Sequence, residues 1–204
     1  MRKLRLGVLG SGSGSNYQAL QDAISHGELD AEIVMVMSDI PQARILERAA
    51  SHGARHAVID CGGFASKFPE ASQRSVAQTM IDAGADVICL AGFMRLIKRP
   101  LLEAFPQRVI NIHPSLLPAF PGLEAWRQAL DAGVAETGCT VHYVDEGMDT
   151  GPIILQEKVP VLPDDDAHSL HQRIQQAEHR LYPRALRELH SPFLQKQIES
   201  STEA

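Results

Sequence analysis

Leu4-Arg5-Leu6-Gly7-Val8-Leu9-Gly10-Ser11-Gly12-Ser13-Gly14-Ser15-Asn16 is the stretch that decides the fold, because an apolar strand runs directly into a glycine-rich turn. The residues after the turn carry the apolar stripe of a helix that ends before Gly27: Tyr17, Leu20, Ala23 and Ile24. A strand, a glycine-rich turn and a helix in this order are typical of the first unit of a parallel α/β sheet.

The same order of strand, loop and helix repeats along the first half of the chain, to about Ile112. Short apolar strands are predicted at residues 4–9, 31–37, 56–59, 86–90 and 109–112, and the amphipathic helices between them include two that stop at Gly53 and Gly84. The fold class is therefore predicted to be α/β, a Rossmann-like, mostly parallel twisted sheet with helices on both faces.

The second half of the chain departs from this order. A helix is predicted at residues 124–132, strands at 139–144 and 153–159, and a final helix after Asp164-Asp165-Asp166, whose charge favours a helix N-terminus. An antiparallel strand is expected at this C-terminal end of the sheet. Residues 191–204 are polar and lack periodicity, so they are predicted to form a tail.

Composition limits the possible partners. A chain of 204 residues, 44% hydrophobic and 22% charged, is long enough for one domain, which is predicted at residues 1–190. The net charge is −6 and the charged residues are interspersed, so there is no basic stripe for nucleic acid and small molecules are the expected partners. Cys61, Cys89 and Cys139 have no CxxC spacing, which is typical of reduced thiols in a cytoplasmic protein. The apolar stretch that ends at Leu9 is too short for a signal sequence, and no later stretch predicts a membrane span.

The glycine-rich turn, residues 10–16, lies where a doubly wound sheet binds ligands, beside the carboxyl ends of its strands. Glycines let backbone N–H groups approach an anion, and the helix N-terminus adds partial positive charge, so the expected ligand is a phosphate. Ser15 takes the place of the third glycine of a dinucleotide motif, and no Gly-Lys-Ser/Thr ending follows, so NAD and ATP are disfavoured. The alternative is that Ser15 and Gln18 form a capping box and the glycines only make a tight turn.

Asn111-Ile112-His113-Pro114-Ser115-Leu116-Leu117-Pro118 ends the fifth predicted strand with an amide and an imidazole on one face, because side chains alternate along a strand. A neutral histidine can move a proton near pH 7, and an amide NH₂ can donate to an oxygen that gains negative charge. Asn111 and His113 together suit attack on a carbonyl carbon. The alternative is that His113 only caps the strand while Pro114 and Pro118 stiffen the loop.

Further along, residues 138–152 predict a strand that runs into a glycine-bounded turn presenting Asp149. Over about residues 4–188 the chain resembles the formyl-tetrahydrofolate transferase family, with four motifs in the family's order: residues 10–16, Ala91-Gly92-Phe93-Met94-Arg95, Asn111-Ile112-His113 and the Asp149 loop. The resemblance implies Asn111, His113 and Asp149 as a catalytic trio. It also implies that the N-terminal half of the domain binds phosphate and the C-terminal half binds folate and carries the catalytic residues.

The resemblance further implies a ribonucleotide site. The phosphate of the ribonucleotide would lie on Gly14, Ser15 and Asn16, and its ribose hydroxyls would donate to Glu178. The alternative for Glu178 is that it lies on a solvated helix face.

The implied folate site adds another group of residues. The main chain at Met94, Arg95 and Leu96 would read the pterin ring, and the side chains of Arg95 and Lys67 would attract the glutamate carboxylates of the folate. The alternative is that Arg95 and Lys67 are ordinary solvated cations. His142 could face the site or a hydrogen-bonded core. The resemblance implies that it supports the site and assigns it no role in proton transfer.

The activity that the resemblance implies is transfer of a formyl group from 10-formyltetrahydrofolate, the co-substrate, to the primary amine of glycinamide ribonucleotide in purine (IMP) biosynthesis. No metal is expected to be required, because His168 and His171 have i, i+3 spacing but belong to no zinc motif. A monomer or a weak homodimer is expected.

Sister enzymes share the trio, so the trio alone does not identify the acceptor of the formyl group. A methionyl-tRNA formyltransferase would normally continue into a basic RNA-binding domain, and a formyltetrahydrofolate hydrolase would carry a small regulatory domain before the first strand. Neither is expected from a chain of this length and charge, and the continuation Phe120-Pro121-Gly122 also favours the purine branch. A ribonucleotide-binding module without activity would not need Asn111, His113 and Asp149.

Overall fold

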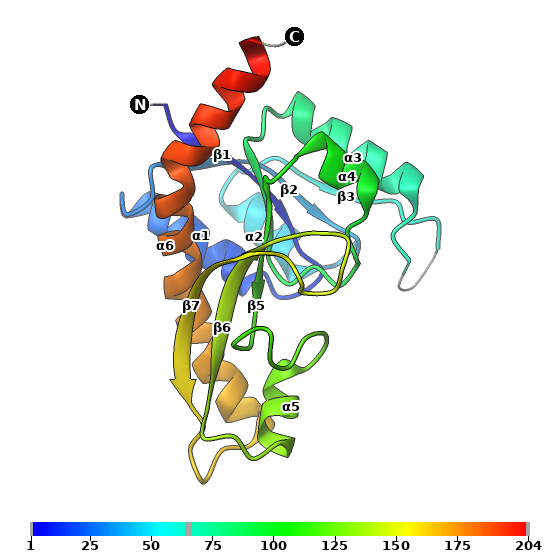
Figure 1. Ribbon diagram of the computed structural model, residues 1–204. Helices are drawn as coiled ribbons and strands as arrows, with labels where there is room; N and C mark the ends of the chain where they lie inside the picture. Colours follow the sequence, from blue (N-terminus) through cyan, green and yellow to red (C-terminus); the bar gives the residue numbers. More distant parts are fainter. Residues whose placement is uncertain (1, 64–66, 203–204) are drawn as a thin grey trace.

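One twisted sheet organises the protein. The computed structural model describes residues 2–63 and 67–202, with side chains described as far as residue 190. Within that part of the chain, seven strands form a sheet in the order β3-β2-β1-β4-β5-β6-β7 (Figure 1). Their bounds are β1 Leu4–Leu9, β2 Ala31–Ser38, β3 His56–Val58, β4 Val87–Leu90, β5 Val109–His113, β6 Glu136–Tyr143 and β7 Ile153–Pro160. Strands β1 to β5 are parallel, and β6 and β7 each run antiparallel to the strand before them. The predicted fold class is confirmed.

Helices cover both faces of the sheet and enclose two cores. The helices are α1 Ser15–Ser25, α2 Arg44–Ser51, α3 Glu70–Asp82, α4 Arg99–Ala104, α5 Ala125–Asp131 and α6 Ala167–Thr202. One core lies between the sheet and the helices α1, α2 and α6, and the other lies between the sheet and α3 and α4 (Figure 1). Since apolar side chains are buried on both faces, the parallel strands read as apolar runs rather than alternating patterns.

Strand β1 shows how the sequence specifies this packing. Leu4, Leu6 and Val8 lie in the core on the α1 and α6 side. Gly7 faces α3, where a Cβ atom would lie only 2.5 Å from the Sδ atom of Met80. A glycine at this position therefore lets α3 pack directly on the strand.

The sheet has a topological switch point between β1 and β4. From β1 the chain winds outward through β2 to β3, and it then returns to place β4 and β5 on the other side of β1. Loops that leave the carboxyl ends of β1 and β4 therefore diverge and leave room for a ligand. The glycine-rich turn and residues 91–96 leave these two strand ends.

Two elements differ from the sequence prediction. The six-residue helix α4 was not predicted, because it starts next to Pro100 and is too short to show a helical period. Helix α6 continues to Thr202, so residues 191–202 of the predicted tail are helical, and residues 203–204 lie outside the described residues. Residues 191–202 include glutamine, lysine and glutamate, which have high helix propensity even where the sequence shows no apolar periodicity.

The short helix α5 is fixed against α6 by an aromatic contact. The rings of Trp126 and His171 lie parallel, with centroids 3.7 Å apart and an interplanar angle of 9°. Burial lowers the pKa of His171, and the nearby His168 lowers it further. In the described ranges, no helix combines the length and apolarity required to cross a lipid bilayer.

Candidate active site

Asn111 faces His142 across the antiparallel pair of β5 and β6. The two residues are direct register partners, and the Asn111 Nδ2 atom lies 3.2 Å from His142 Nε2. His142 Nδ1 lies 2.8 Å from the Tyr143 carbonyl oxygen, which can only accept, so Nδ1 carries the proton. Nε2 is then the acceptor for one Asn111 N–H. Burial lowers the pKa of His142, which favours this neutral form. His142 therefore orients the Asn111 amide.

His113 is the last residue of β5 and is nearly buried. Its Nε2 atom lies 2.9 Å from the carbonyl oxygen of Phe120 and donates to it. Its Nδ1 atom lies 3.4 Å from Asp149 Oδ2, and the two side chains are 6% and 13% exposed. Because Nε2 already carries a proton, Nδ1 can donate to Asp149 only when the ring is an imidazolium. The geometry thus suits a positively charged His113 beside a carboxylate.

Asp149 is held by its loop in a conformation that few side chains adopt. Its φ angle is 56°, in the left-handed region that aspartate tolerates better than most residues. The Gly122 N–H donates to Asp149 Oδ2 at 2.8 Å, and Oδ1 lies 3.7 Å from His142 Nε2. The structure therefore brings together the three residues of the predicted trio, Asn111, His113 and Asp149, with His142 between two of them.

The loop that follows His113 is tied down by side chains that the sequence did not identify. Ser115 is fully buried and donates to the Ala119 carbonyl at 2.6 Å. Thr140 Oγ1 donates to the Ser115 carbonyl at 2.6 Å and accepts from the Leu117 N–H at 3.1 Å. The Leu117-Pro118 peptide bond is cis. These contacts fix the loop that supplies the Phe120 carbonyl to His113, and only the stiffness of its prolines was visible in the sequence.

Gly14 is the N-cap residue of helix α1, whose first turn therefore has no side-chain cap. Gly14 has a φ angle of 71°, and a Cβ atom there would lie 2.8 Å from the backbone of Ile45. The alternative that Ser15 and Gln18 form a capping box is wrong, because the Gln18 side chain bonds to Asp22 and Arg48 instead. The first N–H groups of α1 are thus presented at the carboxyl edge of the sheet, as an anion site requires.

Asn16 and Glu178 meet inside the protein, 162 residues apart in sequence. Asn16 Nδ2 donates to Glu178 Oε2 at 2.9 Å. Glu178 is only 5% exposed, so the alternative of a solvated helix face is wrong. Burial raises the pKa of Glu178 to about 7, and the hydrogen bond from Asn16 opposes this shift. Within the described residues the Asn16 Oδ1 atom is buried without a partner. This pair leaves an acceptor ready for a ligand.

Residues 91–97 leave β4 in an alternating pattern. Phe93, Arg95 and Ile97 are buried, whereas Met94 and Leu96 are 59% and 45% exposed. The Arg95 guanidinium bonds to Asp39 and to the Lys67 carbonyl, so the alternative of a solvated Arg95 is wrong. The Lys67 side chain is exposed.

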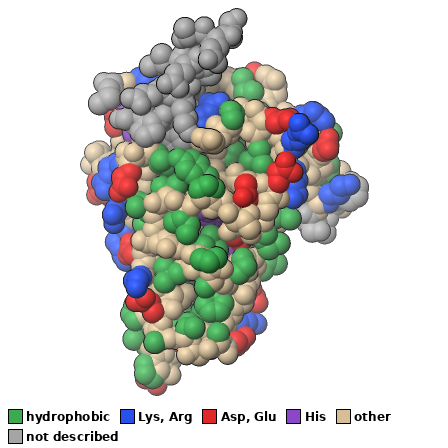
Figure 2. All heavy atoms as spheres, viewed as in Figure 1, with side chains coloured by type: hydrophobic (Ala, Val, Ile, Leu, Met, Phe, Trp, Pro, Cys, Tyr) green, Lys and Arg blue, Asp and Glu red, His purple; other side chains and the backbone are tan. Residues whose placement is uncertain are grey.

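Hydrophobic side chains are exposed close in sequence to the trio. Leu123 follows Gly122, and Met148 precedes Asp149; both are at least half exposed. Figure 2 shows hydrophobic side chains gathered on the face that carries β6, β7 and α5, with histidine atoms visible near its centre. An apolar border of this kind suits a ligand with aromatic rings.

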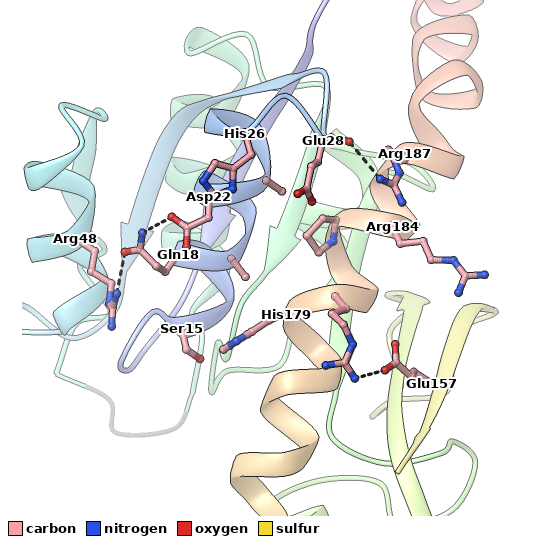
Figure 3. Close-up of a pocket in the computed structure, with 14 residues that line it drawn as sticks. Ser15, Gln18, Asp22, His26, Glu28, Arg48, Glu157, His179, Arg184 and Arg187 are labelled. Carbon is pink, nitrogen blue, oxygen red and sulfur yellow. Dashed lines mark hydrogen bonds and ion pairs between the residues drawn. The ribbon is translucent and has the colours of Figure 1, made fainter.

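A separate groove of about 660 Å³ lies between α1 and α6. It shares Ser15 with the glycine-rich turn, but the trio does not line it. Figure 3 shows that Arg48 bonds to Gln18 and Arg187 bonds to the Glu28 carbonyl within the groove. Arg180 bonds there to Glu157.

The fold and the site together define a doubly wound α/β protein, a class that binds ligands at the switch point of its sheet. Near that point, the Asn111 amide contacts His142, and the His113 imidazole lies beside the Asp149 carboxylate. The chain belongs to the formyl transferase family, whose profile matches residues 4–186.

Individual relatives agree with this assignment. The phosphoribosylglycinamide formyltransferase of Bacillus subtilis is 40% identical over 185 residues, which are 91% of this chain and 94% of that protein. The trifunctional purine biosynthetic protein adenosine-3 of Drosophila melanogaster is 50% identical over 187 residues, and the chain spans only 14% of its length. The crystal structure of glycinamide ribonucleotide transformylase 1 from Geobacillus kaustophilus superposes with a TM-score of 0.87 at 47% identity, covering 92% of this chain and 99% of that one.

Proposed function

We propose that the protein transfers the formyl group of 10-formyltetrahydrofolate to the primary amine of glycinamide ribonucleotide, a step of purine biosynthesis. One arrangement supports this activity most strongly: His113 lies beside Asp149, and Asn111 is linked to Asp149 through His142, next to the loops that leave β1 and β4. Relatives named phosphoribosylglycinamide formyltransferase cover most of the chain, which supports the same acceptor.

The ribonucleotide would bind along the start of α1. Its phosphate would lie on the N–H groups of Gly14, Ser15 and Asn16, where the helix N-terminus offers partial positive charge. Its ribose hydroxyls would donate to Glu178, and the buried Asn16 Oδ1 atom would gain a partner. The amine would then extend toward β5.

The folate would lie across the end of β4. The main chain at Met94, Arg95 and Leu96 would bond to the pterin ring, and the exposed Met94 and Leu96 side chains would contact its apolar faces. The Arg95 guanidinium is engaged with Asp39, so Lys67 is the more accessible cation for the glutamate carboxylates.

The chemical step is attack of the neutral amine on the formyl carbon, which produces a tetrahedral oxyanion. One N–H of the Asn111 amide bonds to His142, and its other N–H would donate to the oxyanion. The imidazolium of His113 would stabilise the same oxygen, while Asp149 holds its charge and orientation. In this structure the Nε2–H of His113 donates to Phe120, so the substrate oxygen must compete with that carbonyl. The amine proton would finally reach the departing folate nitrogen, through Asp149 or water.

No acyl-enzyme intermediate and no metal are part of this proposal. The amine is itself a competent nucleophile when neutral, and positioning the two substrates together supplies much of the acceleration. We further propose that the protein acts in the cytoplasm as a monomer or weak homodimer.

The direct test mixes the purified protein with glycinamide ribonucleotide and 10-formyltetrahydrofolate and follows the absorbance of the released tetrahydrofolate. We expect release that depends on the ribonucleotide. Release without the ribonucleotide would indicate a hydrolase, and formylation of methionyl-tRNA in its place would indicate the sister transferase. Binding of the ribonucleotide with no transfer in the complete mixture would indicate a module without activity.

A further inference from the structure

Ser11 joins the loops that follow three different strands. Its hydroxyl donates to Asp39 Oδ1 at 2.6 Å and accepts from the Met94 N–H at 2.9 Å. Its own N–H donates to the Gly92 carbonyl at 3.0 Å. Ser11 belongs to the glycine-rich turn after β1, Asp39 follows β2, and Gly92 and Met94 follow β4. One hydroxyl thus connects the loop proposed to hold phosphate with the segment proposed to hold the pterin.

Asp39 and Arg95 form a buried ion pair next to this hydroxyl. Arg95 Nε lies 2.6 Å from Asp39 Oδ2, and the two side chains are 5% and 3% exposed. Arg95 also donates to the Lys67 carbonyl at 2.6 Å. Removing two charges from water is costly, and such pairs often stabilise a fold no better than apolar residues of the same size. The pair is therefore better explained by the geometry that it imposes than by stability.

The ion pair imposes the alternation of buried and exposed side chains along residues 93–97. Because Arg95 is held inward by Asp39, its neighbours Met94 and Leu96 point outward. The Met94 N–H is fixed to Ser11, which the same carboxylate holds through its other oxygen. The contact through Ser11 and the contact through Arg95 thus both connect this segment to Asp39.

We infer that Asp39 is a positioning residue, which acts through Ser11 and Arg95 to hold the main chain at 94–96 in the conformation that binds the pterin of the folate. This inference rests on the proposed function, because it concerns the folate site of that function.

The experiment measures binding of tetrahydrofolate, the product that carries the same pterin, and of glycinamide ribonucleotide by separate calorimetric titrations. The variants are Asp39→Asn, Ser11→Ala and the double variant. The matched control is Asp86→Asn, because Asp86 is also buried and also paired with an arginine, Arg2. Asp86 directly precedes β4, at the amino end of that strand, whereas the proposed folate segment follows its carboxyl end.

We expect Asp39→Asn and Ser11→Ala each to weaken tetrahydrofolate binding by about 10-fold to 100-fold, as expected for displacements of about 1 Å in a binding segment. The double variant should bind tetrahydrofolate almost as well as the weaker-binding single variant, because both substitutions break the same connection from Asp39 through Ser11 to Met94. Asp39→Asn should leave ribonucleotide binding nearly unchanged and raise the KM for 10-formyltetrahydrofolate more than it lowers kcat. Asp86→Asn should keep full tetrahydrofolate affinity.

Unchanged tetrahydrofolate affinity in both single variants, or an equal loss in Asp86→Asn, would overturn the inference. Should Asp39→Asn fail to fold, Ser11→Ala decides alone, because it keeps the ion pair and removes only the hydroxyl. If the parent protein binds no tetrahydrofolate, the proposed function itself is overturned. If the parent protein and both single variants bind tetrahydrofolate equally well, only the role of Asp39 is overturned.

Discussion

Replacing Asp149 by asparagine removes the negative charge that faces His113 and keeps the shape of the side chain. The Gly122 N–H donates to Asp149 Oδ2, so the amide oxygen of the variant should remain on that side. Its NH₂ group would then face His142 Nε2, which Oδ1 faces at 3.7 Å in the parent protein. Asp149→Asn should therefore preserve the loop and the affinities for both substrates.

The size of the effect follows from the distance between the two groups. Unit charges 3.4 Å apart, the separation of His113 Nδ1 and Asp149 Oδ2, attract by about 1 kcal/mol in bulk water and about 5 kcal/mol at an effective dielectric constant of about 20. The Asp149 side chain is 13% exposed, so the loss for an imidazolium should lie between these limits, at about 3 kcal/mol. A loss of about 3 kcal/mol slows the chemical step by roughly 10²-fold.

Single-turnover kinetics with the protein in excess over 10-formyltetrahydrofolate isolate that step. The matched control is Asp145→Asn in the same loop, since Asp145 Oδ1 only accepts from the Gly147 N–H and the Thr150 hydroxyl, and an amide oxygen can do the same. We expect a much smaller change there. An unchanged rate in Asp149→Asn, or equal slowing in Asp145→Asn, would refute the electrostatic reasoning.

Further substitutions test the other roles. His113→Ala should lower turnover by roughly 10²-fold to 10⁴-fold with the fold kept, since His113 ends a strand, and near-normal turnover would remove it from the mechanism. Asn111→Ala should lower kcat by about 10²-fold to 10³-fold, and a change in KM alone would make it a binding residue. The double variant Ser15→Ala, Asn16→Ala should weaken binding of glycinamide ribonucleotide but not of tetrahydrofolate, and calorimetric loss of both would indicate a damaged fold. Burial raises the pKa of Glu178 from its usual 4.5 to about 7, so its carboxyl group is mostly protonated below pH 7. The ribonucleotide should therefore bind more tightly as the pH rises toward 7, by up to about tenfold per pH unit. The same pH dependence of binding in Glu178→Gln would exclude this group.

The sequence predicted the features that follow from periodicity. The two-residue repeat of a strand placed Asn111 and His113 on one face, and the alternation of strands and helices placed the loops after β1 and β4 at one edge of the sheet. These inferences need only local geometry, so they hold without knowledge of side-chain partners.

Partners from distant segments were beyond the reach of the sequence. The sequence left open that Arg95 is a surface cation, because its carboxylate, Asp39, is 56 residues away and carries no motif. The capping box at Ser15 failed because Gly14 adopts the left-handed conformation and itself becomes the N-cap. The sequence also left open that Glu178 is solvated, because nothing in its own helix reveals the contact with Asn16. The alternatives for Arg95 and Glu178 failed on burial, which depends on tertiary packing.

The contact between Trp126 and His171 gives the protein a natural optical probe. Trp126 is the only tryptophan of the chain, so the intrinsic indole emission reports on the junction of α5 and α6. Gly122, which holds Asp149, lies four residues before Trp126, at the entrance to α5. A stacked imidazole that gains a proton quenches indole emission, and burial lowers the pKa of His171, so emission should stay bright at neutral pH and fade on acidification. Changes at the junction of α5 and α6 can thus be followed in the unlabelled protein.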